Sequence, residues 1–150
     1  MRDMKFAVAS DHAALTLKNR LRDQLREWGH EVEDLGTHGP ESVDYPDFAH
    51  AVATAVQQGR CERGVLVCGT GLGMAMAANR HRGIRAAVCG DVFSARMSRA
   101  HNDANILCLG ARVLAPEYAI EILKMWLDTP YEGTRHVRRV AKIELPEGQS

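Results

Sequence analysis

A cysteine followed by alternating glycines is the first feature of this sequence that could do chemistry. Cys68 ends an apolar run at 64–68, and the next five residues are Gly69-Thr70-Gly71-Leu72-Gly73. Glycines let the backbone approach a ligand closely, and their amides at the start of a helix can bind an anion. A thiol placed there can lose its proton and act as a base or nucleophile. The alternative is a tight strand–helix turn with an inert, buried cysteine.

Three better-known glycine-rich motifs do not fit this segment. The dinucleotide fingerprint G-x-G-x-x-G needs a glycine at position 74, which is occupied by Met74. A phosphate-binding P-loop would end in Lys followed by Ser or Thr, and that pair is missing. A cysteine phosphatase loop would carry an arginine six residues after its cysteine, which is again the position of Met74.

Two further groups carry acid–base side chains. Asp11-His12 follows an apolar run at 5–10, and His101-Asn102-Asp103 precedes another at 106–109. A histidine beside a carboxylate or an amide can be an oriented general acid or base. The alternatives are that Asp11 only caps the next helix and that 101–103 is a polar turn ending a helix.

A basic group completes the candidates. Arg112, Arg135 and Arg139 could converge on a phosphate with help from His12, because arginine offers paired donors in a fixed geometry. The alternative is a solvated surface face. The 19 basic and 19 acidic residues give a formal net charge of zero, which argues against a nucleic acid or an anionic membrane as partner. A local excess of positive charge therefore favours a small anionic ligand.

The elements that must position these residues alternate between strand and helix. Apolar runs predict strands at 5–10, 31–35, 64–68, 84–89 and 106–109, and periodic apolar faces predict helices at 13–28, 47–59, 74–80, 91–100 and 116–127. Five such units predict a single α/β domain over 1–150, a doubly wound αβα sandwich with a five-stranded parallel sheet of Rossmann-like type. Ligands of such sheets bind at the carboxyl ends of the strands.

Composition and cysteine spacing indicate the cellular compartment and the absence of a metal site. The run Phe6–Ala9 is too short for the core of a signal peptide, and no stretch approaches the ~20 apolar residues of a membrane helix. The four cysteines have no C-x-x-C spacing, and the histidines show no metal-ligand spacing. We therefore expect reduced cytoplasmic thiols and no metal, with Cys61, Cys89 and Cys108 structural or incidental.

Together these residues resemble one family, the type B ribose-5-phosphate isomerases and their galactose-6-phosphate isomerase relatives. The matching segments span residues 5 to about 140 in the family's order: Ser10-Asp11-His12, Asp44-Tyr45-Pro46, Cys68-Gly69-Thr70-Gly71, Ala77-Ala78-Asn79, Ser98 with His101-Asn102-Asp103, and Arg135-His136 with Arg139. One branch of the family uses a glutamate in the glycine-rich segment where this chain has Met74. The presence of Cys68 therefore favours the cysteine-dependent branch.

The resemblance implies a role for each candidate. Cys68 would be the base that moves a proton between C1 and C2 of an open-chain sugar phosphate. The amides of 69–73 would stabilise the enediolate oxygen. His101 would open the furanose ring, assisted by Thr70. Asp11 would transfer the hydroxyl protons, and Asn102 would bind the enediolate region. The remaining residues would line the pocket or hold the phosphate: His12, Tyr45, Arg112, Arg135, His136 and Arg139.

The resemblance also implies a homodimer or tetramer whose active sites are shared between subunits, with the segment from about 129 contributing to the dimer and the phosphate site. It implies a sugar phosphate as substrate, no cofactor, and the ribose 5-phosphate to ribulose 5-phosphate reaction of the pentose phosphate pathway. Two alternatives stay open. One is an isomerase of allose 6-phosphate, galactose 6-phosphate or a tetrose phosphate. The other is a non-catalytic sugar-phosphate binding module on the same fold.

Overall fold

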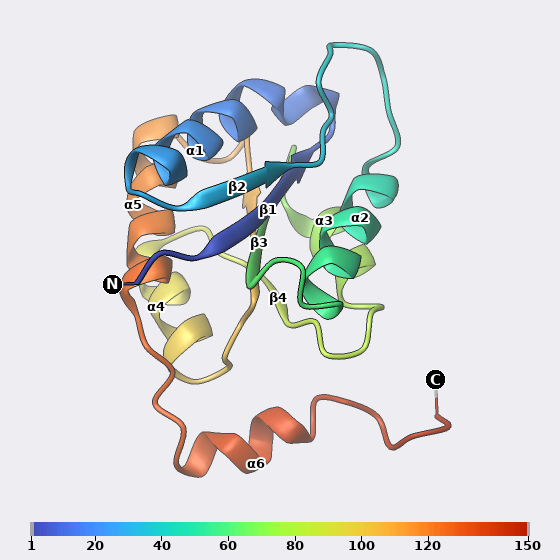
Figure 1. Ribbon diagram of the computed structural model, residues 1–150, viewed down its shortest axis with the longest axis vertical. Helices are drawn as coiled ribbons and strands as arrows, with labels where there is room; N and C mark the ends of the chain where they lie inside the picture. Colours follow the sequence, from blue (N-terminus) through green and yellow to red (C-terminus); the bar gives the residue numbers. More distant parts are fainter. Residues whose placement is uncertain (1, 150) are drawn as a thin grey trace.

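Five parallel strands form the centre of the computed structural model, which describes residues 2–149 (Figure 1). The strand order is β2-β1-β3-β5-β4. The strands are β1 (Lys5–Ser10), β2 (Glu31–Asp34), β3 (Arg63–Cys68), β4 (Ala86–Val88) and β5 (Ile106–Gly110). The helices are α1 (Leu15–Glu27), α2 (Tyr45–Gln57), α3 (Leu72–Ala78), α4 (Val92–Ala100), α5 (Pro116–Asp128) and α6 (Arg135–Ala141), and a short 3-10 helix, η1 (His12–Ala14), precedes α1.

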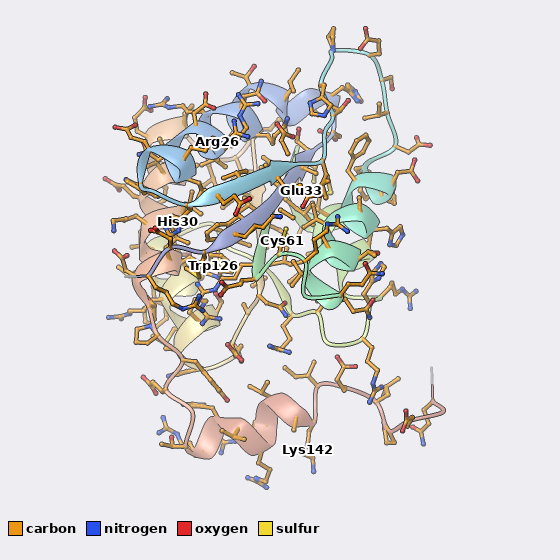
Figure 2. The ribbon with its side chains drawn as sticks, viewed as in Figure 1. Arg26, His30, Glu33, Cys61, Trp126 and Lys142 are labelled. Atoms are coloured by element: carbon orange, nitrogen blue, oxygen red, sulfur yellow. The ribbon has the colours of Figure 1, made fainter. Side chains whose placement is uncertain are left out.

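Two apolar layers cover the sheet because successive strand residues point to opposite faces. In β1, Phe6 and Val8 pack in the layer formed by α1, α4 and α5, which surrounds Trp126 (Figure 2). Ala7 and Ala9 pack on the other face, with α2 and α3. The predicted αβα sandwich with a five-stranded parallel sheet is therefore confirmed.

Helices α2 and α3 both begin two residues earlier than predicted. Helix α2 begins at Tyr45, with Asp44 at its N-cap, whereas the sequence predicted a helix from position 47. Pro46 lies in the first turn, where its missing N–H costs nothing, so the helix can begin before the predicted position and include this residue. Helix α3 begins at Leu72, immediately after Gly71 at φ +85°, instead of at Met74.

Helix α6 is the element that the sequence pattern did not predict. It lies outside both helical layers, beyond one end of the sheet (Figure 1). Its only apolar residues besides Ala141 are Val137 and Val140, and Val137 is exposed. Hydrophobic periodicity therefore gives almost no signal for this helix. Within residues 2–149, no helix is both long and apolar enough to span a lipid bilayer.

A buried ion cluster anchors the loop that follows β2. Lys18 is 1% exposed, and its Nζ donates to both carboxylate oxygens of Asp34 at 2.9 and 2.8 Å. Arg22 and the amide of Gly36 also donate to Asp34. Burial raises the pKa of Asp34, but the hydrogen bonds from Lys18, Gly36 and Arg22 outweigh it and hold the pKa below the ordinary 3.8.

Replacing Asp34 with asparagine should therefore lower the free energy of unfolding by about 3–5 kcal/mol, because it leaves the Lys18 ammonium buried without its counter-charge. Urea titration at neutral pH measures the loss. Asp128→Asn, which breaks the exposed pair with Lys124, should cost less than about 0.5 kcal/mol. Equal losses in the two variants would mean that the buried cluster contributes no more than a surface pair.

The same cluster gives stability a pH dependence. Since the pKa of Asp34 is lower in the folded than in the unfolded chain, its stabilisation is complete above the unfolded value and disappears as the pH falls through the folded value. The difference in unfolding free energy between wild type and Asp34→Asn should therefore shrink in acid. A difference that stays constant down to pH values below both pKa values would contradict this.

Candidate active site

Cys68 lies at the carboxyl end of the central strand β3, with its side chain buried. The amide of Gly71 donates to Cys68 Sγ at 3.1 Å, so the turn folds back over the sulfur. This turn requires glycine at position 71, since φ is +85° and a Cβ would lie 3.1 Å from the backbone of Leu109. Thr70 Oγ1 accepts a hydrogen bond from the amide of Leu72, which fixes the threonine side chain beside the turn.

Tyr45 and Arg112 both lie against this turn. A Cβ at Gly73 would lie 2.4 Å from Tyr45 Cε1, so the tyrosine ring occupies the space that a larger residue would fill. The Arg112 side chain lies over Gly69, and its amide donates to the Gly69 carbonyl at 3.0 Å. Both side chains are exposed. They form the rim of the site above the buried sulfur.

Asp11 and His12 join the same end of the sheet from β1. The Asp11 amide donates to the carbonyl of Val67, the residue before Cys68. Its carboxylate accepts from the amide of Ala14 at 3.1 Å, so Asp11 does cap the helical segment that follows. His12 Nδ1 accepts from the amide of Val43 and thereby ties down the loop at 35–44. The candidate residues that follow β1, β3 and β5 therefore lie together in one chain, at the carboxyl ends of these strands.

The other three cysteines are held as thiols. Burial, aided by a hydrogen bond to Glu33, raises the pKa of Cys61 to about 11 (Figure 2). Burial raises the pKa of Cys89 to about 11 as well, and it raises that of Cys108 further. These values fit the interpretation that the three are structural. Cys68 differs from these three in its position, at the end of a strand and beneath a glycine turn.

His101 and Asn102 lie at the opposite end of the sheet from Cys68. They follow α4 and precede β5, whose last residue, Gly110, pairs with Cys68. The four residue steps from Ile106 to Gly110 span about 13 Å at about 3.3 Å per residue. In Figure 1 the strand arrowheads point away from α6, the helix that carries Arg135 and Arg139. The arginines therefore do not converge with Arg112 within one chain.

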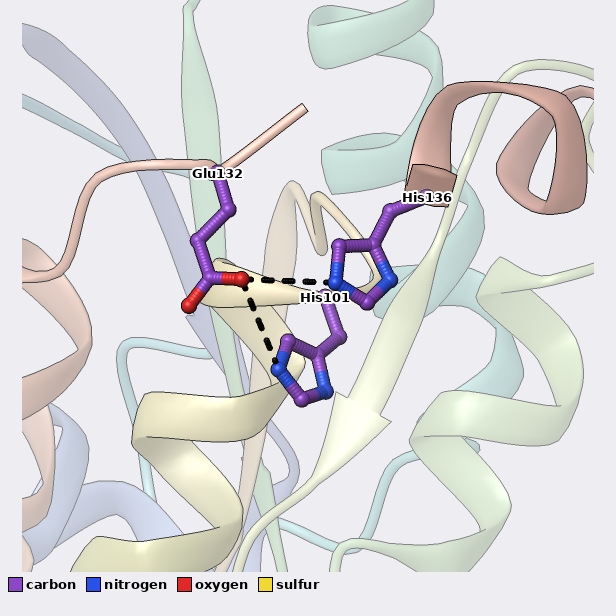
Figure 3. A group of neighbouring side chains, drawn as sticks. All are labelled: His101, Glu132 and His136. Carbon is purple, nitrogen blue, oxygen red and sulfur yellow. Dashed lines mark ion pairs between the residues drawn. The ribbon is translucent and has the colours of Figure 1, made fainter. Parts of the chain in front are cut away.

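At this second end, a carboxylate faces two stacked imidazoles (Figure 3). Glu132 Oε2 lies 3.7 Å from His101 Nε2 and 3.3 Å from His136 Nε2. The two rings stack with centroids 4.2 Å apart and planes 17° apart. No spacing in the sequence indicated Glu132, because it lies 31 positions from His101 and beside no other candidate but the arginine–histidine segment.

These three residues are also the group of donors that comes nearest to a metal site among the described residues. Their ligand atoms lie within 4.8 Å of one another, although the sequence spacing gave no sign of a ligand set. A nitrogen lone pair lies in the plane of its imidazole ring, so those of nearly parallel, stacked rings do not converge on one ion. A tetrahedral site needs such convergence, and the arrangement therefore does not fit a metal.

Positive charge without counter-charge gathers on α6. The ion pairs found within residues 2–149 include neither Arg135 nor Arg139, and Arg112 at the other end of the sheet is likewise in none of them. Nearby, Asn102 lines a cavity of about 780 Å³ between residues 79–87 and the C-terminal segment. Cys68 does not line this cavity. The candidate residues of one chain therefore form two separate groups, one at each end of the sheet.

Comparison with known proteins places these features in a family. A model of the family described as Ribose/Galactose Isomerase matches residues 6–143. The solved structure of ribose-5-phosphate isomerase B from Clostridium thermocellum superposes with a TM-score of 0.92 at 54% sequence identity, covering 93% of this chain and 95% of that one.

Two curated relatives show the range of named activities. Ribose-5-phosphate isomerase B of Escherichia coli is 47% identical over 143 residues, which is 95% of this chain and 96% of that protein. D-erythrulose-4-phosphate isomerase of Pectobacterium atrosepticum is 43% identical over 148 residues, 97% of each chain. The named sugar therefore differs between relatives of almost equal similarity.

Proposed function

Because the chain belongs to the ribose/galactose isomerase family, we propose that this isomerase interconverts D-ribose 5-phosphate and D-ribulose 5-phosphate. The five-carbon substrate is supported by the relatives from Escherichia coli and Clostridium thermocellum, which carry that name. The reaction moves one proton between neighbouring carbons and needs no redox cofactor. Because a phosphate ester is charged and crosses a lipid bilayer poorly, we place the enzyme with its substrate in the cytoplasm.

The thiolate of Cys68 is the proposed base. It removes the proton from C2 of the open-chain aldose, giving a cis-enediolate, and the proton returns to C1. Backbone amides of 69–73 stabilise the enediolate oxygen. Those of Gly71 and Leu72 already donate to Cys68 Sγ and Thr70 Oγ1, which leaves Gly69, Thr70 and Gly73 for this role. Asp11, one strand away, moves the hydroxyl protons.

The observation that carries the proposal is the separation of the two groups of candidate residues. One chain holds the base and Arg112 at the carboxyl ends of its strands, and holds His101, Asn102 and α6 at the other end. We propose that the carboxyl end of one copy meets the α6 end of a second, so that a homodimer, alone or within a tetramer, contains two complete sites. Exposed apolar side chains support such a contact, among them Leu72 and Met76 of α3, Val88 of β4 and Phe93 of α4.

In the assembled site, substrate contacts come from both copies. His12 and Arg112 of one copy, with Arg135, His136 and Arg139 of its partner, hold the phosphate. Tyr45 lines the pocket, and Asn102 binds the enediolate region. His101 of the partner opens the ring, assisted by Thr70. Phosphate binding far from the reacting carbons supplies energy that can position C1 and C2 against the thiolate.

A direct assay tests the substrate. Purified wild-type protein is given D-ribose 5-phosphate, and formation of D-ribulose 5-phosphate is followed. We expect a higher kcat/KM for this substrate than for tetrose or hexose phosphates. Faster turnover of D-erythrulose 4-phosphate, the sugar named for the Pectobacterium relative, would replace the five-carbon substrate with a four-carbon one. Binding without turnover of any aldose phosphate would favour a non-catalytic binding module.

A further inference from the structure

Glu132 is a charged residue near α6 that the proposed mechanism does not use. Its backbone amide donates to the carbonyl of Ala100 at 3.0 Å, directly before His101, and thus ties the segment leading to α6 to the end of α4. Its half-exposed carboxylate presents the single atom Oε2 to the Nε2 atoms of His101 and His136 (Figure 3). The residue therefore stands between a proposed catalytic group and a proposed phosphate ligand.

The chemistry of the three groups determines where the ring protons lie. An ionised carboxylate only accepts hydrogen bonds, so a nitrogen that faces it is favoured when it carries the proton. His101 Nε2 lies 3.7 Å from Oε2, beyond hydrogen-bond distance, so the carboxylate acts on this ring through its charge. The tautomer with the proton on Nε2 leaves Nδ1 with a free lone pair. His136 Nε2 is buried and forms no hydrogen bond of good geometry, so Oε2 at 3.3 Å is the acceptor available to it.

We propose that Glu132 is a positioning residue that holds His101 as the Nε2–H tautomer and directs its Nδ1 at the sugar ring bound in the partner's crevice. This inference rests on the proposed function. Nδ1 takes the proton of the C1 hydroxyl and returns it to the ring oxygen O4 as the C1–O4 bond breaks and the C1=O bond forms. The carboxylate stabilises the imidazolium present between the two transfers. Stacking on His136 fixes the plane of the ring.

The tautomer can be read without any turnover. In protein labelled with ¹⁵N-histidine, at a pH well above the ordinary imidazole range, the two ring nitrogens of His101 have different chemical shifts. The signals are assigned by their loss in His101→Asn. We expect the Nε2–H form to dominate in the wild type and to lose population in Glu132→Gln. Glu27→Gln, on the exposed end of α1, should leave the His101 signals unchanged. Unchanged signals in Glu132→Gln would overturn the proposal.

Activity gives a second readout that a merely structural role would not reproduce. Glu132→Gln should lower kcat for ribose 5-phosphate at least about tenfold, as expected for a weakened general acid–base group. The same variant should still exchange the C1 hydrogen of ribulose 5-phosphate with deuterium from solvent, because that ketose cannot close a furanose ring and exchange needs only the Cys68 base. Glu132→Asp should recover part of the loss. Equal loss of turnover and exchange would overturn the positioning role.

The two proposals fail in different ways. If the wild type shows the predicted His101 tautomer but isomerises no aldose phosphate, the role of Glu132 stands and the proposed function is wrong. If the wild type is active but Glu132→Gln changes neither the His101 signals nor turnover, the proposed function stands and the role of Glu132 is wrong. Loss of stability in Glu132→Gln with an unchanged tautomer would make Glu132 only a structural link between α4 and α6.

Discussion

Replacing Cys68 with alanine is expected to lower kcat by about 10³-fold while leaving the affinity for the sugar phosphate nearly unchanged. A general base contributes roughly 10²–10⁴-fold to turnover, and alanine has no atom that can take the proton. Cys68→Ser should also lose most turnover, since a serine hydroxyl does not ionise near neutral pH, whereas a thiol can lose its proton and act as a thiolate base. Steady-state kinetics and binding of a substrate analogue measure the two effects separately.

Cys61→Ala is the matched control for this loss. Cys61 is also buried, but it lies before β3, at the end of the strand away from the proposed site, and contacts Glu33. Its removal should leave kcat unchanged. Unfolding curves of both variants show whether they remain folded at the assay temperature. Turnover by Cys68→Ser close to that of the wild type would remove Cys68 from the mechanism.

Replacing Arg135 with alanine should raise KM about 10–100-fold with a smaller change in kcat. The expected size follows from the roughly 1.5–3 kcal/mol of a hydrogen bond between charged groups. The loss should fall mainly on binding, because the arginine contacts the phosphate and not the reacting carbons. Inhibition by inorganic phosphate should weaken in parallel.

Arg26→Ala removes the same charge from α1, on the body of the molecule, and should leave KM within about twofold. Equal changes in the two variants would show that only net charge matters. Unchanged KM and kcat in Arg135→Ala would mean that the phosphate binds elsewhere.

The residues at the carboxyl ends of the strands could be predicted from the sequence because local rules determine them. A β-branched run leading into glycines predicts a strand and a turn, and parallel strands bring their carboxyl ends together. Asp11, Cys68 and Arg112 were therefore expected at one edge. The same topology puts His101 at the opposite edge, because it lies between a helix and the next strand, but that separation was not predicted from the sequence.

The contacts of Glu132 could not be predicted from the sequence. They depend on the path of the chain after α5 and on α6, a helix of seven residues with four cationic or histidine side chains and little apolar surface. Burial of Lys18 against Asp34 was missed for a related reason, because periodicity does not indicate which charged residues will be paired inside. Both features involve polar side chains brought together by tertiary structure.

Complementation between two inactive variants tests the central claim, that each active site is built from two copies of the chain. Cys68→Ala and His101→Ala are refolded together, so that mixed dimers form. In a mixed dimer both replacements fall in one site and the other site is intact. Random pairing makes about half of the dimers mixed, so about a quarter of the wild-type activity should return. No recovery in mixtures that contain mixed dimers would contradict the shared site and place Cys68 and His101 in the same chain's site.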